Sequence, residues 1–330
     1  MTNMICLGIE STAHSFGVGI VSSKGKVLTN IIDMYKPSGG WGIKPMEAGE
    51  HHEKTAENVL AKALSESGLK IDDIDIISFS QGPGLPPCLR QGLNLARNLA
   101  MKTCRPLIGV NHCIAHIEIG RLTTELNDPV TLYVSGANTQ VLAFVSGRYR
   151  CFGETQDVGI GNALDKFGRG TGLEFPAGPK IENLAKDGKY IPLPYVVKGM
   201  DLSFSGIITE CLKKYKEGGK LEDLCFSLQE TVFAMLTEVT ERALAHTDKS
   251  EVLLTGGVAA NSRLQEMLDI MCRERGASFA VVDRAYSGDN GAMIAWTGLL
   301  AYKSGQKPLD PKKADILPRQ RTDDVEISWI

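Results

Sequence analysis

Short apolar runs rich in β-branched residues surround a polar loop at the start of the chain. Residues 4–9 and 16–21 flank the loop from Glu10 to Ser15, which predicts a strand, a tight turn and a second strand. Residues 26–34 fit a third strand. From Glu47 to Ser67 the apolar positions instead recur every three to four residues, as they do on one face of a helix.

Strands and helices then alternate along the chain. Residues 74–81 and 106–110 are short apolar runs typical of buried strands, and residues 88–101 and about 112–125 have the spacing of helices. This alternation favours parallel strands that are joined by helices.

The second half of the chain begins with the same pattern. Residues 131–135 and 140–145 flank a loop from Gly136 to Thr139, and the segments 9–21 and 133–145 are strand–loop–strand units of equal length. A pattern that recurs in this way is typical of a duplicated domain.

Further strands and helices follow the second loop. We expect a strand meander at residues 151–158, a mainly helical stretch at 160–250, a strand, Gly turn and helix at 251–264, a strand at 278–283 and a helix at 289–304, with an irregular tail. Strands followed by alternating helices and strands, twice over, predict a duplicated α/β protein, and 330 residues are enough for two cores.

The charge balance argues against a protein that binds nucleic acid without help. There are 36 Lys and Arg against 39 Asp and Glu, which gives a net charge of −3, whereas nucleic-acid-binding proteins are more often basic. The modest basic stretches at 148–150, 213–216 and 312–313 are typical of solvated surface, although together they could supply a few phosphate contacts. A nucleic-acid substrate would therefore depend on local patches or on partner subunits.

The cysteines and the N-terminus indicate a cytoplasmic protein. The eight cysteines form no CxxC pair, which argues against a thiolate zinc site and suits reduced thiols. The first residues lack the basic and apolar regions of a signal peptide, and no apolar run is long enough to span a bilayer. We expect no membrane association.

Two histidines and an aspartate are candidates for a metal site. His112 and His116 stand four residues apart, so both imidazoles lie on one helix face, and Asp289 stands between two glycines before an apolar helix. Cys113 occupies the position of the catalytic Glu in the HExxH motif, so the zincin protease motif is absent. A solvated histidine pair and a helix-capping acid remain open as alternatives.

Three loops of small residues are candidates for a nucleotide site. Hydroxyl groups and backbone N–H groups in tight loops can hold a phosphate, and paired glycines before a helix allow close approach of a ligand to the helix N-terminus. Ordinary polar turns and glycines needed for conformation are the alternatives. The loop residues are Ser11, Thr12 and His14 in the first loop, Ser135, Gly136 and Ala137 in the second, and Gly256, Gly257 and Asn261 in the third.

The chain carries nine motifs in the order and near the spacing of one known family. They are GIESTAHSFGVGI, EHH at 50–52, GPGLPPCLRQG, NHCIAHIE, YVSGANTQV, ALDKFGR, DLSFSG, LLTGGVAAN and SGDNGAMIAW. The sequence resembles the universal tRNA threonylcarbamoyladenosine transferases from about residue 4 to Trp329. Its ending, RQRTDDVEISW, is similar to the archaeal and eukaryotic type. That type is the catalytic subunit of the KEOPS assembly, formerly called O-sialoglycoprotein endopeptidase.

The resemblance implies a fold and a domain arrangement. The family has the duplicated actin-like, Hsp70-like and sugar-kinase fold, related to ribonuclease H, with a nucleotide cleft between two domains. We expect an N-terminal domain at residues 1–128, completed by a C-terminal segment from about residue 300. The second domain would span residues 129–300 and carry a helical insertion at about 160–250.

The resemblance also implies a set of site residues. One divalent metal ion, iron or zinc, would be held by His112, His116 and Asp289, with Tyr133 as a candidate fourth ligand. Where the family usually has Gly, this chain has Ala137, whose methyl group could crowd a phosphate, and His14 stands where bacterial members often have Asp. The implied nucleotide contacts are Tyr133, Val134, Ser135, Gly136 and Ala137 along the strand and loop, and Asp165, Gly178, Glu182 and Asn261 at the ribose and base.

The implied activity is a metal-assisted acyl transfer. The family moves the threonylcarbamoyl group of threonylcarbamoyl-AMP to N6 of adenosine 37 in tRNAs that read ANN codons, and AMP is released. Its partners include a small atypical kinase and a small dimerisation subunit. Two other functions of the same fold stay open on the residues alone, an ATP-dependent small-molecule kinase and an Hsp70-like nucleotide-gated scaffold. Neither would need the paired histidines.

Overall fold

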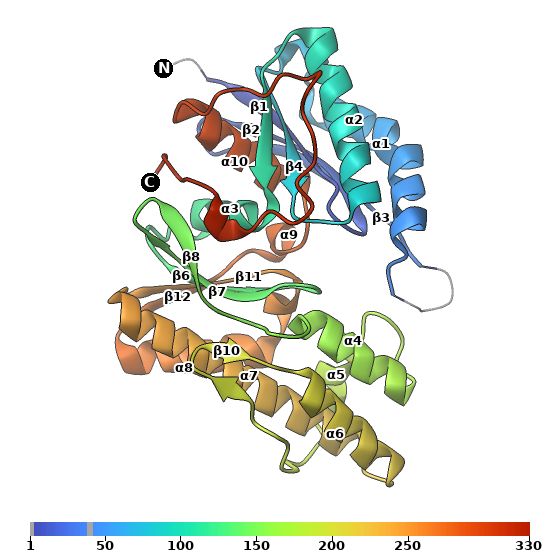
Figure 1. The fold of residues 1–330 in the computed structure, drawn as a ribbon, viewed down its shortest axis with the longest axis vertical. Coiled ribbons are helices and arrows are strands. Elements are labelled where there is room, and N and C mark those ends of the chain that lie inside the picture. The colour runs from blue at the N-terminus through green and yellow to red at the C-terminus, as the bar shows by residue number, and fades with distance from the viewer. Residues whose placement is uncertain (1–2, 38–41) are drawn as a thin grey trace. The chain divides into compact units, whose positions relative to one another are not determined.

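The computed structural model describes residues 3–37 and 42–330 and divides the chain into two compact units (Figure 1). Unit 1 comprises Met1–Leu122, Ser146–Tyr149 and Gly288–Ile330, and unit 2 comprises Thr123–Val145 and Arg150–Ser287. Unit 1 therefore contains both ends of the chain and the tip of one hairpin from the middle.

Unit 1 is built on a five-stranded mixed sheet in the order β3-β2-β1-β4-β5. β1 pairs antiparallel with β2 and parallel with β4, and β4 pairs parallel with β5. The parallel strands end at the same edge of the sheet, which places the residues that follow them together. The strands are β1 (Ile5–Glu10), β2 (Ser15–Ser22), β3 (Val27–Met34), β4 (Ile76–Gly82) and β5 (Leu107–Asn111).

Helices cover both faces of this sheet, which is why every residue of β2 is buried. Alternate side chains such as Leu7 and Val18 pack with residues of α1 (Pro45–Ser67) and α2 (Pro86–Thr103) in one core. The glycines between them face α10 (Gly291–Lys303): a Cβ at Gly8 would lie 2.1 Å from the backbone N of Ala295. The absence of side chains there lets α10 lie directly on the strands. α3 (His112–Thr124) follows β5, and the 3-10 helices of unit 1 are η2 (Ile71–Asp73) and η4 (Thr322–Asp324).

Unit 2 repeats the topology of unit 1. Its sheet has the order β12-β11-β6-β7-β8, with β6 antiparallel to β7 and parallel to β11. The predicted duplicated α/β fold is therefore confirmed. The strands are β6 (Val130–Val134), β7 (Thr139–Val145), β8 (Arg148–Glu154), β11 (Glu251–Thr255) and β12 (Ser278–Val281).

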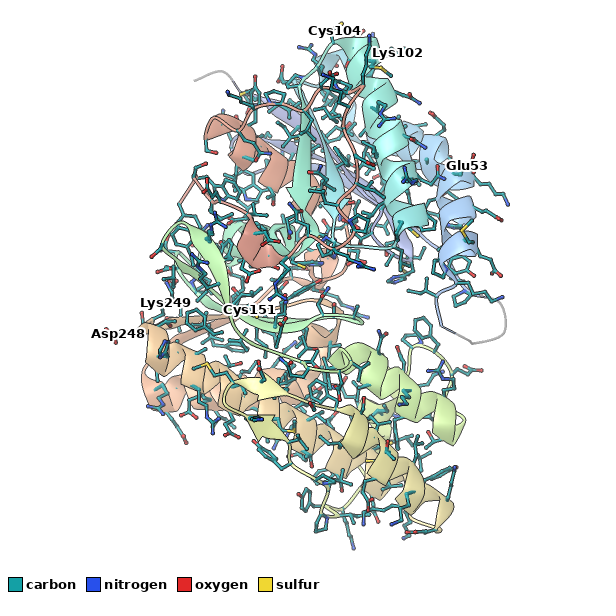
Figure 2. The ribbon with its side chains drawn as sticks, in the orientation of Figure 1. Glu53, Lys102, Cys104, Cys151, Asp248 and Lys249 are labelled. Atoms are coloured by element: carbon teal, nitrogen blue, oxygen red, sulfur yellow. The ribbon has the colours of Figure 1, made fainter. Side chains whose placement is uncertain are left out.

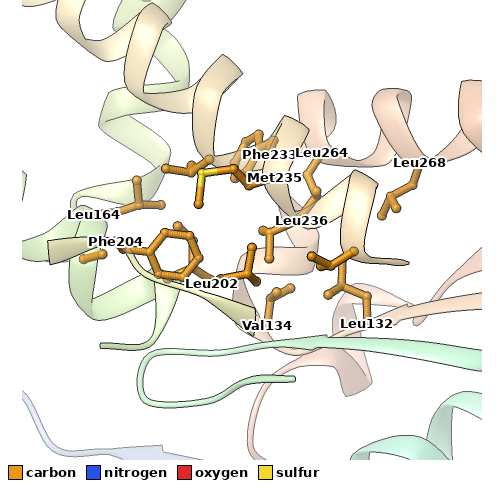
Figure 3. Close-up of a cluster of buried hydrophobic side chains, with 14 of the residues drawn as sticks. Leu132, Val134, Leu164, Leu202, Phe204, Phe233, Met235, Leu236, Leu264 and Leu268 are labelled. Atoms are coloured by element: carbon orange, nitrogen blue, oxygen red, sulfur yellow. The ribbon is translucent and has the colours of Figure 1, made fainter. Parts of the chain in front are cut away.

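The helices of unit 2 pack on this sheet around a continuous apolar core. Leu132 and Val134 of β6 meet Phe233 and Leu236 of the long helix α7 in that core (Figure 3). A short hairpin with Gly199 at its turn (φ 67°) interrupts the stretch that we expected to be mainly helical. The elements are α4 (Ile160–Thr171), α5 (Gly178–Ala185), β9 (Val197–Lys198), β10 (Asp201–Leu202), α6 (Ser205–Lys216), α7 (Leu221–Thr247), η3 (Gly257–Ala260), α8 (Ser262–Arg275) and α9 (Arg284–Ser287).

All eight cysteines have free thiols. Cys104 is exposed at the end of α2 and Cys151 is half-buried in β8, and both are labelled in Figure 2. The others are buried, and burial raises the pKa of the Cys6 thiol to about 12, which makes it a poor nucleophile. In the described part of the chain, no helix has the length and apolar character needed to cross a bilayer.

Candidate functional site

The two histidines lie at the start of α3, directly after β5. Asn111 caps this helix, because its Oδ1 accepts hydrogen bonds from the N–H groups of Cys113 (3.0 Å) and Ile114 (3.2 Å). His112 is the first residue of the helix and His116 lies one turn later on the same face, with ring centroids 4.8 Å apart. Both rings are buried.

Asp289 reaches both histidines from the other end of the sequence. Its Oδ1 lies 3.3 Å from Nε2 of His116 and 3.5 Å from Nε2 of His112. Asn290, the residue after Asp289, caps α10, because its Oδ1 accepts the N–H of Met293 at 3.0 Å. Asp289 is thus not the side chain that caps α10.

These three side chains fit a divalent metal ion. Their donor atoms all lie within 4.8 Å of one another. The separations of 3.3 and 3.5 Å exceed the roughly 2.7–2.9 Å of a charge-assisted hydrogen bond. They are close to the about 3.4 Å that separates donors bound tetrahedrally at about 2.1 Å from one ion. Two imidazoles and one carboxylate are a donor set that suits zinc or ferrous iron.

Glu10, which the sequence reasoning did not single out, completes this arrangement. Its Oε2 lies 3.0 Å from Nδ1 of His112, and its Oε1 accepts the backbone N–H of Thr12 at 2.7 Å. The side chain of Glu10 is fully buried. A carboxylate that holds Nδ1–H leaves Nε2 bare and turned toward the other donors, as in many carboxylate–histidine–metal sites. The sequence does carry a signal for Glu10, because an acidic residue stands at the end of the predicted strand that becomes β1. β1 and β5 end at the same sheet edge, so this residue lies next to His112, which follows β5.

Charged and titratable groups are concentrated at this site. Burial lowers the pKa of His112, but the charges of Glu10 and Asp289 outweigh this and raise it to about 9. Burial likewise raises the pKa of Asp289, but the two histidines outweigh this and lower it. Burial also lowers the pKa of His116. The two carboxylates that attract a proton to His112 would equally favour a divalent cation in its place.

The first loop is held in place by its own surroundings. Ser11 Oγ points at α2, where a Cβ on Gly92 would lie 2.1 Å from it, and Thr12 donates its N–H and hydroxyl to Glu10. Among the described residues, nothing accepts the N–H groups of Ala13 and His14. The hydroxyl of Thr12 is thus engaged within the protein, whereas, among the described residues, the buried Ser11 Oγ has no hydrogen-bond partner.

The second loop stands at the carboxyl end of β6 in unit 2. β11 runs parallel to β6, so the second and third loops begin at the same sheet edge, where α/β proteins commonly bind ligands. The carbonyl of Ser135 accepts the N–H of Gly161 (3.1 Å), and that of Gly136 accepts the N–H of Asn162 (2.9 Å). Gly136 and Ala137 are exposed at the N-terminus of α4, while Tyr133 and Val134 are buried in β6.

The two glycines of the third loop have different roles. Gly256 has φ 96°, and a Cβ on it would lie 2.3 Å from the carbonyl oxygen of Val134, so the fold itself requires glycine there. Gly257 is exposed, and a Cβ on it would meet nothing within 4 Å. The packing of the protein therefore does not explain why Gly257 lacks a side chain.

The strand, Gly turn and helix expected at 251–264 are present, but the first helical turn after the glycines is a 3-10 helix and not α-helix. The 3-10 helix η3 follows Gly256, because the chain turns sharply at its positive φ, and α8 starts only at Ser262. Asn261 caps α8 by accepting the N–H groups of Arg263 (2.9 Å) and Leu264 (3.2 Å), and it donates to Gln229 Oε1 (3.0 Å). Its side chain is thus engaged within the protein.

The remaining candidates for the nucleotide site, Asp165, Gly178 and Glu182, lie on α4 and α5 of unit 2. Asp165 Oδ1 accepts the N–H of Ala177 at 2.8 Å, and Glu182 Oε1 accepts the N–H of Ser262 at 2.8 Å. Within the part of the chain that the structure describes, nothing bonds to the second oxygen of either carboxylate. A Cβ on Gly178 would have only Leu164 Cδ1 near it, at 4.0 Å. Each carboxylate therefore has one oxygen without a hydrogen-bond partner among the described residues.

Known proteins similar to this chain agree on one family. The family model described as tRNA N6-adenosine threonylcarbamoyltransferase matches residues 24–296. A protein of that name from Thermococcus kodakarensis is 56% identical over 330 residues, covering 99% of this chain and 100% of the relative. Another from Methanopyrus kandleri is 52% identical, covering 99% of this chain and 96% of the relative.

Other relatives are longer than this chain. A probable bifunctional tRNA threonylcarbamoyladenosine biosynthesis protein from Methanobrevibacter smithii is 55% identical over 330 residues. The match covers 100% of this chain but 61% of that relative. The chain therefore spans less than two thirds of the length of this relative.

Solved structures support the fold. Thermococcus kodakarensis HypF superposes with a TM-score of 0.66 at 16% identity, over 92% of this chain and 48% of that chain. Component A of (R)-2-hydroxyglutaryl-CoA dehydratase from Acidaminococcus fermentans superposes with a TM-score of 0.56 at 12% identity, over 92% of this chain and 100% of that chain. These likenesses confirm the expected actin-like fold, and the sequence matches establish that the chain belongs to the tRNA N6-adenosine threonylcarbamoyltransferase family.

Proposed function

We propose that this chain transfers the threonylcarbamoyl group of threonylcarbamoyl-AMP to N6 of adenosine 37 in tRNAs that read ANN codons, with release of AMP. Family membership supports the reaction class. The observation that carries the proposal is the set of His112, His116 and Asp289, whose donor atoms lie within 4.8 Å of one another, with Glu10 at Nδ1 of His112. Neither a small-molecule kinase nor a nucleotide-gated scaffold needs such a set.

The chemistry explains why such a set is useful. The N6 amine is a weak nucleophile because its lone pair is delocalised into the purine ring. A bond forms between N6 and the carbamoyl carbon, the bond from that carbon to the phosphate oxygen breaks, and a phosphate oxygen of the substrate takes the N6 proton. A divalent metal, when bound, supplies Lewis acidity for the carbonyl and the leaving phosphate.

The protein groups orient the reactants. Glu10 fixes the orientation of the His112 ring. We propose that the backbone amides of Ala13 and His14 donate to a negatively charged oxygen of a substrate. Holding two reactants in line can lower the barrier by roughly 7–11 kcal/mol at best.

The nucleotide is assigned to the loops of unit 2. We place the adenosine at Gly256, Gly257 and Asn261, and the phosphates over Ser135–Ala137. The open space at Gly257, where a Cβ would meet nothing within 4 Å, supports this assignment. The ribose is assigned to the free carboxylate oxygens of Asp165 and Glu182, next to Gly178.

The Gly257→Val variant tests this assignment. We expect it to weaken binding of an ATP analogue at least tenfold, about 1.4 kcal/mol, because the new side chain fills the space of the ligand and not of the protein. Isothermal titration measures the affinity, and metal analysis of the same sample should show unchanged metal content. Gly206→Val on α6 is the matched control, because its Cβ also meets nothing within 4 Å. Equal affinities for Gly257→Val and wild type would remove the adenosine from this turn.

The whole proposal is tested by transfer of labelled threonylcarbamate to tRNA. We expect weak modification by the chain alone, because its net charge is −3, and strong modification when the small kinase and the small dimerisation subunit are added. Full activity of the chain alone at physiological salt would contradict the need for partners. Absence of transfer under both conditions would contradict the function itself.

A further inference from the structure

Two neighbouring helices of unit 2, α4 and α6, both carry exposed cations. α4 and α6 pack through Gly170 and Leu212, since a Cβ on Gly170 would lie 2.4 Å from Leu212 Cδ2. Leu212 also lines a hollow of about 400 Å³ together with Lys213 and Lys216. Lys166 stands one turn before Gly170 on the same face of α4. The two helices lie side by side in Figure 1.

We define the α4–α6 basic patch as Lys166, Arg169, Lys213 and Lys216. All four side chains are exposed. Within the described ranges 3–37 and 42–330, none of the four forms a salt bridge. Two nearby lysines of unit 2 are paired instead: Lys214 with Glu210 at 3.4 Å, and Lys180 with Glu174 at 2.9 Å.

The balance of charge at this patch is unlike that of the whole chain. Lys213, Lys216 and one acid, Glu217, line the hollow. Lys166 and Arg169 of α4 add two cations next to the carboxylate of Asp165. The patch is therefore net positive, whereas the complete chain has a net charge of −3. Lysines in the last turn of a helix stabilise its dipole, which accounts for Lys213 and Lys216 singly. The helix dipole does not account for Lys166, which lies in the middle of α4. It also does not explain why α4 and α6, which both carry cations, lie next to each other.

The patch lies close to the loop assigned to the phosphates of the nucleotide. Gly161 at the start of α4 donates its N–H to the carbonyl of Ser135. At about 1.5 Å per residue, Lys166 and Arg169 are roughly 8 and 12 Å farther along the helix axis. An RNA whose adenosine reacts with that nucleotide must bring the backbone phosphates of its neighbouring nucleotides close to these two side chains.

We propose that the α4–α6 basic patch docks the phosphate backbone of the substrate tRNA. This inference rests on the proposed function, because that function makes a polyanionic RNA the substrate. Four cations that neutralise phosphates release counterions, so the patch should contribute a strongly salt-dependent part of the affinity. It also accounts for how an acidic chain holds RNA, since the charge is gathered locally.

The test compares two double variants with a control of equal charge change. Lys213→Ala with Lys216→Ala, and Lys166→Ala with Arg169→Ala, each remove two cations from the patch. Lys54→Ala with Lys62→Ala removes two exposed lysines of α1 in unit 1. Binding of a tRNA with an ANN-reading anticodon to the full chain is measured by fluorescence anisotropy between 50 and 200 mM salt.

Each patch variant should lower the salt slope by about 1.4–1.8, because each lost phosphate contact removes about 0.7–0.9. The corresponding loss of affinity at 100 mM salt is at least about tenfold. The α1 control should keep the slope of the wild type, and all variants should bind the ATP analogue within about twofold of wild type. This result would support the patch as the RNA surface.

Three outcomes would overturn the proposal. An unchanged slope in both patch variants would mean that the tRNA docks elsewhere, and an equal drop in the α1 control would mean that the effect is one of net charge. Loss of ATP-analogue binding together with tRNA binding would make the four side chains structural. Transfer assays separate the two proposals: tRNA binding through the patch without transfer refutes only the proposed function, and transfer that ignores the patch refutes only the docking surface.

Discussion

We expect the His116→Ala variant to lose its divalent metal and its transfer activity while it keeps its fold. His116 supplies one of three donors that lie within 4.8 Å of one another, and no other His, Cys, Asp or Glu of the described residues joins that group. Two donors bind a divalent ion much more weakly than three, so the loss should exceed the roughly 10–100-fold that follows removal of a group hydrogen-bonded to a metal ligand. Metal analysis, circular dichroism and the transfer assay measure the three effects.

The control for this prediction is His51→Ala in the same unit. His51 is half-buried and pairs with Asp33 at 2.9 Å, and it is not one of the three donors. This variant should retain metal and activity. If His116→Ala retained full metal and activity, the metal assignment would be wrong. If it unfolded, His116 would be a structural core residue.

The Glu10→Gln variant should weaken metal binding about 10–100-fold without removing a ligand. Glu10 Oε1 accepts the N–H of Thr12 at 2.7 Å, and Oε2 faces Nδ1 of His112 at 3.0 Å. In the variant the amide oxygen stays with Thr12, so the amide N–H faces Nδ1. His112 must then accept at Nδ1 and carry its proton on Nε2, which is the nitrogen that should bind the metal.

Glu118→Gln is the matched control for this second prediction. Glu118 is also buried in unit 1, but its carboxylate bonds to Tyr149 (2.6 Å) and Arg121 (2.9 Å) and not to a histidine. Competition with a chelator measures the metal affinity of both variants. Equal losses of metal affinity in Glu10→Gln and Glu118→Gln would show that the effect comes from the loss of a buried charge and not from the tautomer of His112. An unchanged affinity in Glu10→Gln would remove Glu10 from the site.

Local spacing was sufficient to predict most elements of the fold. The helix expected at 289–304 is α10 (Gly291–Lys303), and the strand expected at 26–34 is β3 (Val27–Met34). Apolar periodicity is a property of neighbouring residues, so it can be read along the chain. The 3-10 helix η3 after Gly256 was missed, because its sequence resembles the first turn of an α-helix and the positive φ that separates them is set by the approach to Val134.

The sequence by itself determined the duplicated α/β architecture and the pairing of His112 with His116, since residues four apart on a helix share a face. Only the tertiary structure decided which carboxylates join them. Asp289 lies 173 residues from His116, and Glu10 lies 102 residues from His112. The parallel pairing of β1, β4 and β5, together with the close packing of α10 on Gly8, closes those separations to hydrogen-bond range. Such contacts depend on how distant elements pack, and no spacing along the chain records that.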